Sequence, residues 1–312
     1  MSSITSRRSF LKFYIALFFI CLFFFLMGLA TMGLFVHLFN SNEFQTRNYG
    51  LIPMFVLILI TAFYVIYKFI KYSPSIKLTE NLVRINFVDY YWKDLEKIEL
   101  TGKRPYIFLV QKEGMMLKFK DKKEITVLDD LYSNLDEIKL YIKNQIVDKN
   151  DQPITTVSKT EISEISHERF VNYKGNQFYN FRGITLWVIM GGLIYASLIN
   201  INHPIALLAL FLMSCISFFG LSYFLYYFKI SDNYLLVSNH NFFWVKKIYR
   251  LNDIKEIVFE QQDRWPNCLI VITSDFKSDF FPAASLLNKN WRQLKTDLEN
   301  KDIKVRNEIY IG

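Results

Sequence analysis

The sequence predicts an α+β membrane protein in which four transmembrane helices form two hairpins, each followed by a small antiparallel β domain with a C-terminal helix. Two observations lead to this fold class. Four long apolar blocks interrupt the 312-residue chain, and one short pattern occurs twice. Residues 76–81 and 228–233 both read hydrophobic, Lys, hydrophobic, hydroxyl, acid, Asn. A repeat at this separation indicates that a hairpin-plus-domain unit was duplicated in tandem.

The apolar blocks cover residues 13–39, 51–70, 184–201 and 205–228. Each has roughly the 17–25 apolar residues that cross a hydrocarbon layer of about 30 Å. None carries Asp, Glu, Lys or Arg in its interior. We therefore expect four membrane-spanning helices.

Basic residues predict the orientation of these helices. Arg7, Arg8 and Lys12 precede the first helix, whereas the two hairpin loops carry only Arg47. Because cytoplasmic flanks are rich in Lys and Arg, both termini and both β domains are expected on the cytoplasmic side of a bacterial inner membrane. Arg7 and Arg8 also match the twin-arginine export pattern, but no convincing cleavage site follows, so we expect the N-terminus to stay attached.

These elements divide the chain into five parts. They are a first transmembrane hairpin (1–72), a first β domain (73–147), a linker (148–168), a second transmembrane hairpin (169–228) and a second β domain (229–312). The linker is polar and without periodicity.

Short strand-like runs fill each β domain. In the first they cover residues 76–78, 82–88, 91–100, 106–111, 115–119 and 124–127. In the second they cover residues 234–238, 242–249, 254–260, 268–273, 279–281 and 303–309. The numbering offset between the copies grows along the strands, which predicts extra residues around 239–250 as an added strand or a longer hairpin. Ile98 and Ile257 fall at equivalent places, and both are expected in the sheet core.

Each domain is expected to end in an amphipathic helix. In the first copy, apolar residues recur at the three- and four-residue spacing of one helical face. They are Leu131, Leu135, Ile138, Ile142 and Ile146. In the second copy, a helix over residues 288–300 presents Trp291, Leu294 and Leu298 on one face.

This layout resembles the bacterial pleckstrin-homology-like (PH-like) domains that directly follow a two-helix membrane hairpin. The residues that carry the resemblance are the strand starts Leu-Thr-Glu-Asn-Leu-Val at 78–83 and Ile-Ser-Asp-Asn-Tyr-Leu at 230–235, together with the strand-opening segments 92–98 and 251–257. The resemblance implies a small β-barrel or bent sheet plugged by the helix, in tandem copies.

Known catalytic and cofactor motifs do not occur in the sequence. The four histidines are isolated from one another and from the cysteines, and no nucleotide-binding, serine-nucleophile or zinc-protease motif is present. We therefore expect no enzymatic activity, no cofactor and no metal site. The formal net charge of +8 lies mainly beside the membrane blocks, which argues against a nucleic-acid partner.

Two groups of residues are candidate contact sites. Lys118, Lys120, Lys122 and Lys123 form a basic cluster, in which strand alternation places Lys118 and Lys120 on one face and Phe119 on the other. Such a cluster can contact anionic lipid headgroups, or it can be a solvated strand edge protected by lysines. Gly192 and Ala196 form a small-x-x-x-small pair, which is typical of close helix packing.

Aromatic residues gather at the membrane ends of both domains. Tyr226 and Tyr227 fit an interfacial belt. The triplets 90–92 and 242–244 come at equivalent places in the two copies. At least one residue of each triplet is expected in the core, and the others either join it or pack the domain against the bilayer.

Together these features predict a non-enzymatic integral inner-membrane protein, held in the lipid bilayer, whose cytosolic PH-like domains bind a protein partner or scaffold an assembly, a homo-oligomer included. Two alternatives stay open. The first is a lipid- or ligand-sensing protein that acts through the basic cluster. The second is a small transporter or channel component, although ionisable residues of the kind that mark transport pathways are missing from the helix interiors.

Overall fold

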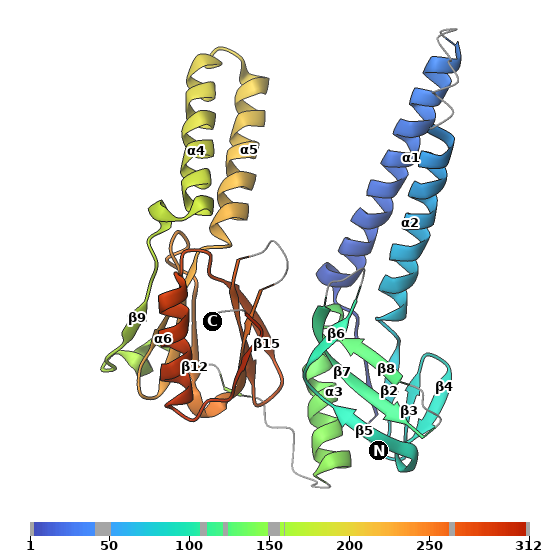
Figure 1. The fold of residues 1–312 in the computed structure, drawn as a ribbon, viewed down its shortest axis with the longest axis vertical. Coiled ribbons are helices and arrows are strands. Elements are labelled where there is room, and N and C mark those ends of the chain that lie inside the picture. The colour runs from blue at the N-terminus through green and yellow to red at the C-terminus, as the bar shows by residue number, and fades with distance from the viewer. Residues whose placement is uncertain are drawn as a thin grey trace. The chain divides into compact units, whose positions relative to one another are not determined.

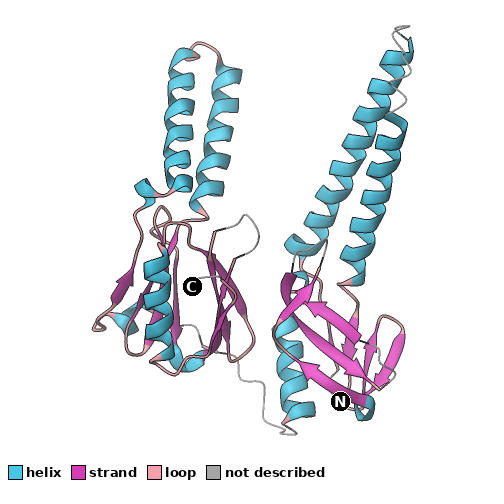
Figure 2. Cartoon of the chain, viewed as in Figure 1, coloured by secondary structure: helices cyan, strands magenta, loops and turns pink. Residues whose placement is uncertain are grey.

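The computed structural model describes residues 3–40, 51–106, 111–120, 124–148, 157–158, 160–261 and 266–309. The chain forms two compact units, Met1–Ile154 and Thr155–Gly312. In each unit, two long helices stand on a small β domain that also carries a shorter helix (Figure 1; Figure 2). The fold is therefore α+β, as the sequence predicts.

Four helices in the described part of the chain are long and apolar enough to cross a membrane, which confirms that prediction. They are α1 (Ala16–Asn40, preceded by the π-helix Phe10–Ile15), α2 (Leu51–Lys71), α4 (Phe181–Ile199) and α5 (Pro204–Ser222). Most of their side chains are not buried within the unit, as expected for helices that face lipid.

The fourth apolar block was expected to stay helical to residue 228, and this is wrong. Helix α5 ends at Ser222, and strand β10 (Tyr226–Ile230) follows. Tyr226, Phe228 and Ile230 are buried on one face of β10, so the two-residue period of a paired strand governs this segment. Tyr226 therefore belongs to the domain core rather than to an interfacial belt.

The first unit contains two antiparallel sheets. One has the order β1 (Ile4–Thr5), β2 (Ile76–Leu78), β3 (Leu82–Ile85) and β4 (Val88–Tyr91); the other places β7 (Gln111–Phe119) beside β5 (Leu95–Glu99), β6 (Lys103–Pro105) and β8 (Glu124–Leu128). Helix α3 (Leu135–Tyr141) continues as a π-helix, Ile142–Val147. Leu135, Ile138 and Ile142 are buried, as predicted.

Two of the predicted strand runs in this unit are interrupted. The run 82–88 is a hairpin that turns at Asn86, whose φ of 56° lies in the left-handed region that Asn tolerates. The run 91–100 is broken by a 3-10 helix, Trp92–Asp94. Most of the predicted run 106–111 lies outside the described residues.

The second unit also contains two sheets. One has the order β9 (Val171–Tyr173), β10, β11 (Tyr234–Asn239) and β12 (Lys246–Arg250); the other has the order β15 (Ser278–Pro282), β14 (Cys268–Thr273), β13 (Ile254–Glu260) and β16 (Val305–Asn307). The connection between β11 and β12 is longer than the turn between β3 and β4. Helix α6 (Asn288–Glu299) buries Trp291, Leu294 and Leu298, which confirms that prediction.

In both units, the segment that precedes the hairpin is part of the β domain. Strand β1 pairs with β2, and β9 pairs with β10. In the first unit the Arg8 guanidinium also donates hydrogen bonds to the carbonyl oxygen of Ser73, at 2.8 and 3.1 Å. The Asn134 side-chain oxygen accepts a hydrogen bond from the Arg7 backbone N–H, and the Asn134 side-chain nitrogen donates one to the Thr5 carbonyl. The segments before the hairpins, which we expected to belong to the hairpins, are therefore bonded to the β domains.

Only one of the two isoleucines expected in the sheet core is fully buried. Ile257 is 0% exposed on β13, which lies between β14 and the parallel strand β16. Ile98 packs against the core but is only partly buried. Its strand β5 pairs with β7 alone among the described residues, because the first unit shows no counterpart of β16 there.

We expect Ile257→Ala to lower the free energy of unfolding of its domain by about 2–5 kcal/mol, because the side chain leaves a closed cavity. Ile98→Ala should cost less than half as much, since solvent already reaches that site. Urea unfolding of the full chain in detergent measures both. It is followed by the reactivity of the buried Cys268 in the second domain and of a cysteine introduced at the buried position Val127 in the first. Equal losses would show that β16 does not close the second core.

Candidate functional site

The first unit contains a groove of about 380 Å³ beneath the end of α2, between β4 and β8. Its lining is Lys71, Tyr72, Pro74, Ile85, Asn86, Val88, Tyr90, Glu124, Ile125 and Thr126. We call it the β4–β8 groove. Val88, Tyr90 and Ile125 supply apolar surface, whereas Lys71 and Glu124 supply one ammonium and one carboxylate. Such a mixture of apolar surface and a few polar groups is typical of binding sites.

The two strands beside the groove each have one ladder partner among the described residues. Strand β4 pairs with β3, and β8 pairs with β7. A strand with one partner has a second side on which backbone N–H and C=O groups can pair with another chain. The groove is therefore flanked by strands that are able to accept a further strand.

In the second unit, the corresponding strands are joined by side chains. Asp279 on β15 accepts hydrogen bonds from the Lys247 ammonium at 2.5 Å and from the Tyr249 hydroxyl at 2.6 Å, both on β12. Burial, and then the charge of Asp279, raises the pKa of Tyr249, so its hydroxyl stays protonated and able to donate. The Lys247 ammonium also lies 5.4 Å from the centroid of the Phe281 ring. A bridge of charged and aromatic groups thus spans β12 and β15.

The first unit has apolar residues where this bridge has charges. Ile125 pairs with Leu117 in the β7–β8 ladder, at the place that Asp279 takes opposite Val271 in the β14–β15 ladder. Val88 precedes the 3-10 helix Trp92–Asp94 by the same spacing as Lys247 precedes the 3-10 helix Leu251–Asp253. Val88 and Ile125 cannot form the ion pair that Lys247 and Asp279 form between β12 and β15. This difference leaves the groove open in the first unit.

The predicted basic cluster begins beside the groove, because Lys118 pairs with the groove residue Glu124 in the β7–β8 ladder. Phe119 is 2% exposed while Lys118 and Lys120 are more exposed, which confirms the strand alternation. The Lys118 ammonium lies 3.9 Å from Glu96, and the Lys120 ammonium lies 3.6 Å from Asp94. These carboxylates come from β5 and the turn before it, and β5 lies at the end of the domain away from α1 and α2 (Figure 1). Lys122 and Lys123 lie outside the described residues.

The small-residue pair lies on α4. Apart from the neighbouring backbone of α4 itself, no atom comes within 4 Å of the position that a Cβ on Gly192 would take. Gly192 therefore lies on a face of α4 that α5 does not cover, and Ala196 follows one turn later on the same helix. Within the described residues, this glycine is not used to bring α4 and α5 together.

The two aromatic triplets do not occupy equivalent places. Tyr90 is 8% exposed on strand β4, whereas Phe242 is 9% exposed in the loop between β11 and β12. Each triplet thus has one core residue, as predicted. Phe243 and Trp244 are 76% and 61% exposed. The longer second hairpin shifts its triplet from the strand to the loop, which is why the sequence comparison misplaced it.

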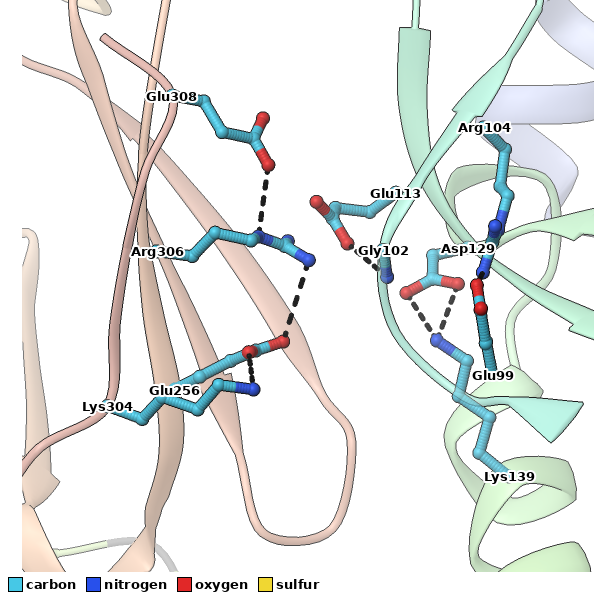
Figure 3. A network of polar contacts seen from close by, with 10 residues as sticks. All are labelled: Glu99, Gly102, Arg104, Glu113, Asp129, Lys139, Glu256, Lys304, Arg306 and Glu308. Atoms are coloured by element: carbon cyan, nitrogen blue, oxygen red, sulfur yellow. Dashed lines mark hydrogen bonds and ion pairs between the residues drawn. The ribbon is translucent and has the colours of Figure 1, made fainter.

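Charged groups also meet inside each domain (Figure 3). In the first unit, the Lys139 ammonium is 2.6 Å from both oxygens of Asp129, and Arg104 is 2.6 Å from Glu99. Lys139 is only 1% exposed, and burial raises the pKa of Asp129 despite this partner. Ion pairs of this kind hold α3 and the strands together, and none of their geometry requires a ligand.

A second network belongs to β13 and β16 (Figure 3). Glu256 is 1% exposed and meets the Lys304 ammonium at 3.0 Å and Arg306 at 3.9 Å. Arg306 also meets Glu308 at 3.0 Å. The described residues contain no group of His, Cys, Asp and Glu that is arranged to hold a metal ion.

Sequence reasoning missed the β4–β8 groove. Its residues are ordinary strand residues, and they form a groove only because β4 and β8 lie opposite each other in the folded domain. The one available signal was the exchange of Asp279 for Ile125, which becomes visible only once the register of the two ladders is known. No protein-family model and no curated protein matches this chain.

Proposed function

We propose that this chain is a non-enzymatic multi-pass membrane protein whose first β domain binds an extended segment of a protein partner in the β4–β8 groove. The observation that carries this proposal is the contrast between the units. The bridge that Asp279 makes with Lys247 and Tyr249 in the second unit is replaced by Val88 and Ile125 in the first. Addition of a strand to an open edge is a common mode of peptide recognition, in which backbone hydrogen bonds give affinity and side-chain pockets give specificity.

The membrane attachment supports a role as a platform. Strands β1 and β9 join the segment before each hairpin to the domain after it, so the chain connects domain and hairpin twice. A partner bound in the groove would therefore be held at a constant height above the bilayer, close to the end of α2. A domain attached in this way is suited to scaffold an assembly at the membrane.

The orientation belongs to the same proposal. The basic flanks favour a bacterial inner membrane with both termini and both β domains in the cytoplasm. The strand pairing of β1 and β9 supports placing the N-terminal segment on the same side as the domains. A cytoplasmic groove would recruit a cytoplasmic protein or a second copy of this chain.

The PH-like resemblance and the duplication are supported by the order of elements. Each unit has a sheet built from one strand before the hairpin and three after it, then a second sheet, then a helix. The open groove in one copy and the bridged strands in the other suit two domains with different tasks. We infer that the first copy binds the partner and that the second copy has a structural role.

A protein ligand is favoured over a lipid at the basic cluster for a specific reason. Lys118 and Lys120 lie 3.9 and 3.6 Å from Glu96 and Asp94, so the charge of those two lysines is partly neutralised. The groove, by contrast, offers the apolar side chains of Val88, Tyr90 and Ile125.

The test places a photo-cross-linking amino acid at Thr126 of the full chain in cells. A discrete adduct with a protein, or with a second copy of the chain, is expected. Val88→Lys with Ile125→Asp rebuilds the bridge of the second unit and should abolish the adduct. The matched control exchanges the charges of the exposed pair Arg84 and Asp89, which lies 2.5 Å apart on β3 and β4, and should leave the adduct intact.

Two results would contradict the proposal. One is an adduct that persists when the bridge is rebuilt. The other is cross-linking to lipid alone, which would indicate that the groove holds an acyl chain or headgroup instead. Protease resistance of the bridged variant confirms that a lost adduct does not come from unfolding.

A further inference from the structure

The β3–β4 turn of the first unit is bonded to the chain just beyond α2. The Asn86 backbone N–H donates to the carbonyl of Ser75 at 2.7 Å, and the Ser75 N–H donates to the Asn86 side-chain oxygen at 3.0 Å. Ser75 follows Lys71, the last residue of α2, by one short turn. These reciprocal bonds place the next residue, Phe87, close to the level at which α2 ends.

The β11–β12 loop of the second unit is bonded to the last turn of α5. The Asn239 amide donates to the carbonyl of Ser222 at 2.8 Å, and the Asn241 amide donates to the Ser222 hydroxyl at 2.7 Å. The Phe242 ring stacks on Phe219 of α5, with centroids 5.7 Å apart. The loop is thus held against the helix end by polar and aromatic contacts.

Both turns carry large aromatic side chains that the domain does not cover. Phe87 is 98% exposed, Phe243 is 76% exposed and Trp244 is 61% exposed. Phe243 and Trp244 contact each other edge to face at 4.8 Å, and Trp244 also packs on Phe242. Rings of this size are costly to leave in water. Their exposure at the corresponding hairpin of each unit calls for an apolar environment outside the domain.

The lengths of the helices identify that environment. Helices α2 and α5 have 21 and 19 residues, which at 1.5 Å per residue corresponds to about 30 Å, the thickness of the hydrocarbon layer. Their ends therefore lie at the boundary between hydrocarbon and headgroups. Trp and Tyr are enriched at that boundary, and Trp, Phe and Leu supply the apolar side chains of helices that lie in it.

We propose that the two hairpin tips, Phe87 in the first unit and Phe243–Trp244 in the second, insert into the interfacial layer of the same bilayer that α1, α2, α4 and α5 span. Lys246, an exposed residue two positions after Trp244, adds a positive charge near this tip for anionic headgroups. Each β domain is then held to the membrane at three places, namely the two helices of its hairpin and its aromatic tip. In the first unit this tip adjoins the β4–β8 groove, because Asn86 and Val88 on either side of Phe87 line it. The proposal concerns the bilayer and does not depend on a protein partner.

The experiment uses the full chain in liposomes of phosphatidylcholine and phosphatidylglycerol. Cys21 and Cys215 are replaced by serine, and Cys268 is kept because it is buried. A nitroxide label is attached to Phe87→Cys or to Phe243→Cys. Relaxation by oxygen, which dissolves in lipid, and by a water-soluble nickel chelate then gives the immersion of each label.

The control labels replace Lys97 on β5 and Glu299 at the end of α6, both with exposed side chains. The tip labels should collide more with oxygen than with nickel, and the control labels should show the reverse. Tip labels as accessible to nickel as the controls would overturn the proposal.

A second measurement keeps the native aromatic ring. Lipids with brominated acyl chains quench nearby tryptophan. The emission that Trp244→Phe removes should be quenched in such liposomes. If that emission is insensitive to brominated lipid, Trp244 does not enter the bilayer and the proposal fails.

Discussion

Trp291→Ala is expected to lower the free energy of unfolding of the second β domain by about 3–5 kcal/mol. This is the usual cost of truncating a fully buried aromatic residue to alanine. Trp291 is 0% exposed, and its ring lies 5.3 Å from Phe259 and 5.7 Å from Phe228. Trp291 thus contacts both sheets of the domain, and with Leu294 and Leu298 it packs α6 into the core. Its removal leaves a cavity that neither sheet can fill without losing its register.

The thiol of Cys268 measures this opening directly. It is 0% exposed on β14, so it reacts with a thiol reagent only when the domain opens. A loss of 3–5 kcal/mol corresponds to labelling that is about 150- to 5000-fold faster in a chain whose Cys21 and Cys215 are serine. Trp244→Ala is the matched control, because Trp244 is 61% exposed and should change the rate by only a few-fold. Equal rates for the two variants would show that α6 does not close the core.

Local patterns made the helices predictable. Apolar blocks without interior charges indicate spanning helices whatever their neighbours are, and the spacing of Trp291, Leu294 and Leu298 describes one helical face by itself. The same reasoning failed where an apolar run is compatible with helix or strand. Tyr226 continues the apolar run of α5, and only its pairing with Asn239 on β11 makes it part of a sheet.

The turns and the groove depend on contacts between distant residues. Asn86 turns the β3–β4 hairpin because its backbone and its side chain both form hydrogen bonds with Ser75. Strand propensity alone does not predict these bonds. The groove depends on Ile125 standing where Asp279 stands in the other copy. A one-residue change of register would exchange the inward and outward faces, so neither site could be read before the ladders were known.

The buried pair of Lys139 and Asp129 gives the largest electrostatic effect that we expect in the first unit. Lys139→Met keeps the aliphatic volume of the side chain and removes its charge. Asp129 then has to remain in the interior without the ammonium that now meets both of its oxygens at 2.6 Å. Removal of one partner of a buried pair costs about 3–5 kcal/mol. Replacement of both, by Lys139→Met with Asp129→Leu, should restore most of that stability.

The pH dependence of Lys139→Met separates this electrostatic cause from a packing defect. Burial raises the pKa of Asp129 above its ordinary value of 3.8, and the loss of Lys139 raises it further because the attraction of the ammonium is gone. The folded variant therefore binds this proton more tightly than the unfolded chain does, so its stability falls as pH rises from about 3.8 through the raised pKa. The defect should be smallest in acid and fully present above that pKa. Labelling of a cysteine at the buried position Val127 measures it, with Lys12→Met, which breaks an exposed pair with Asp130, as the control that should lose less than about 1 kcal/mol. A defect that is the same at every pH would mean that the methionine packs badly and that the charge of Asp129 is not the cause.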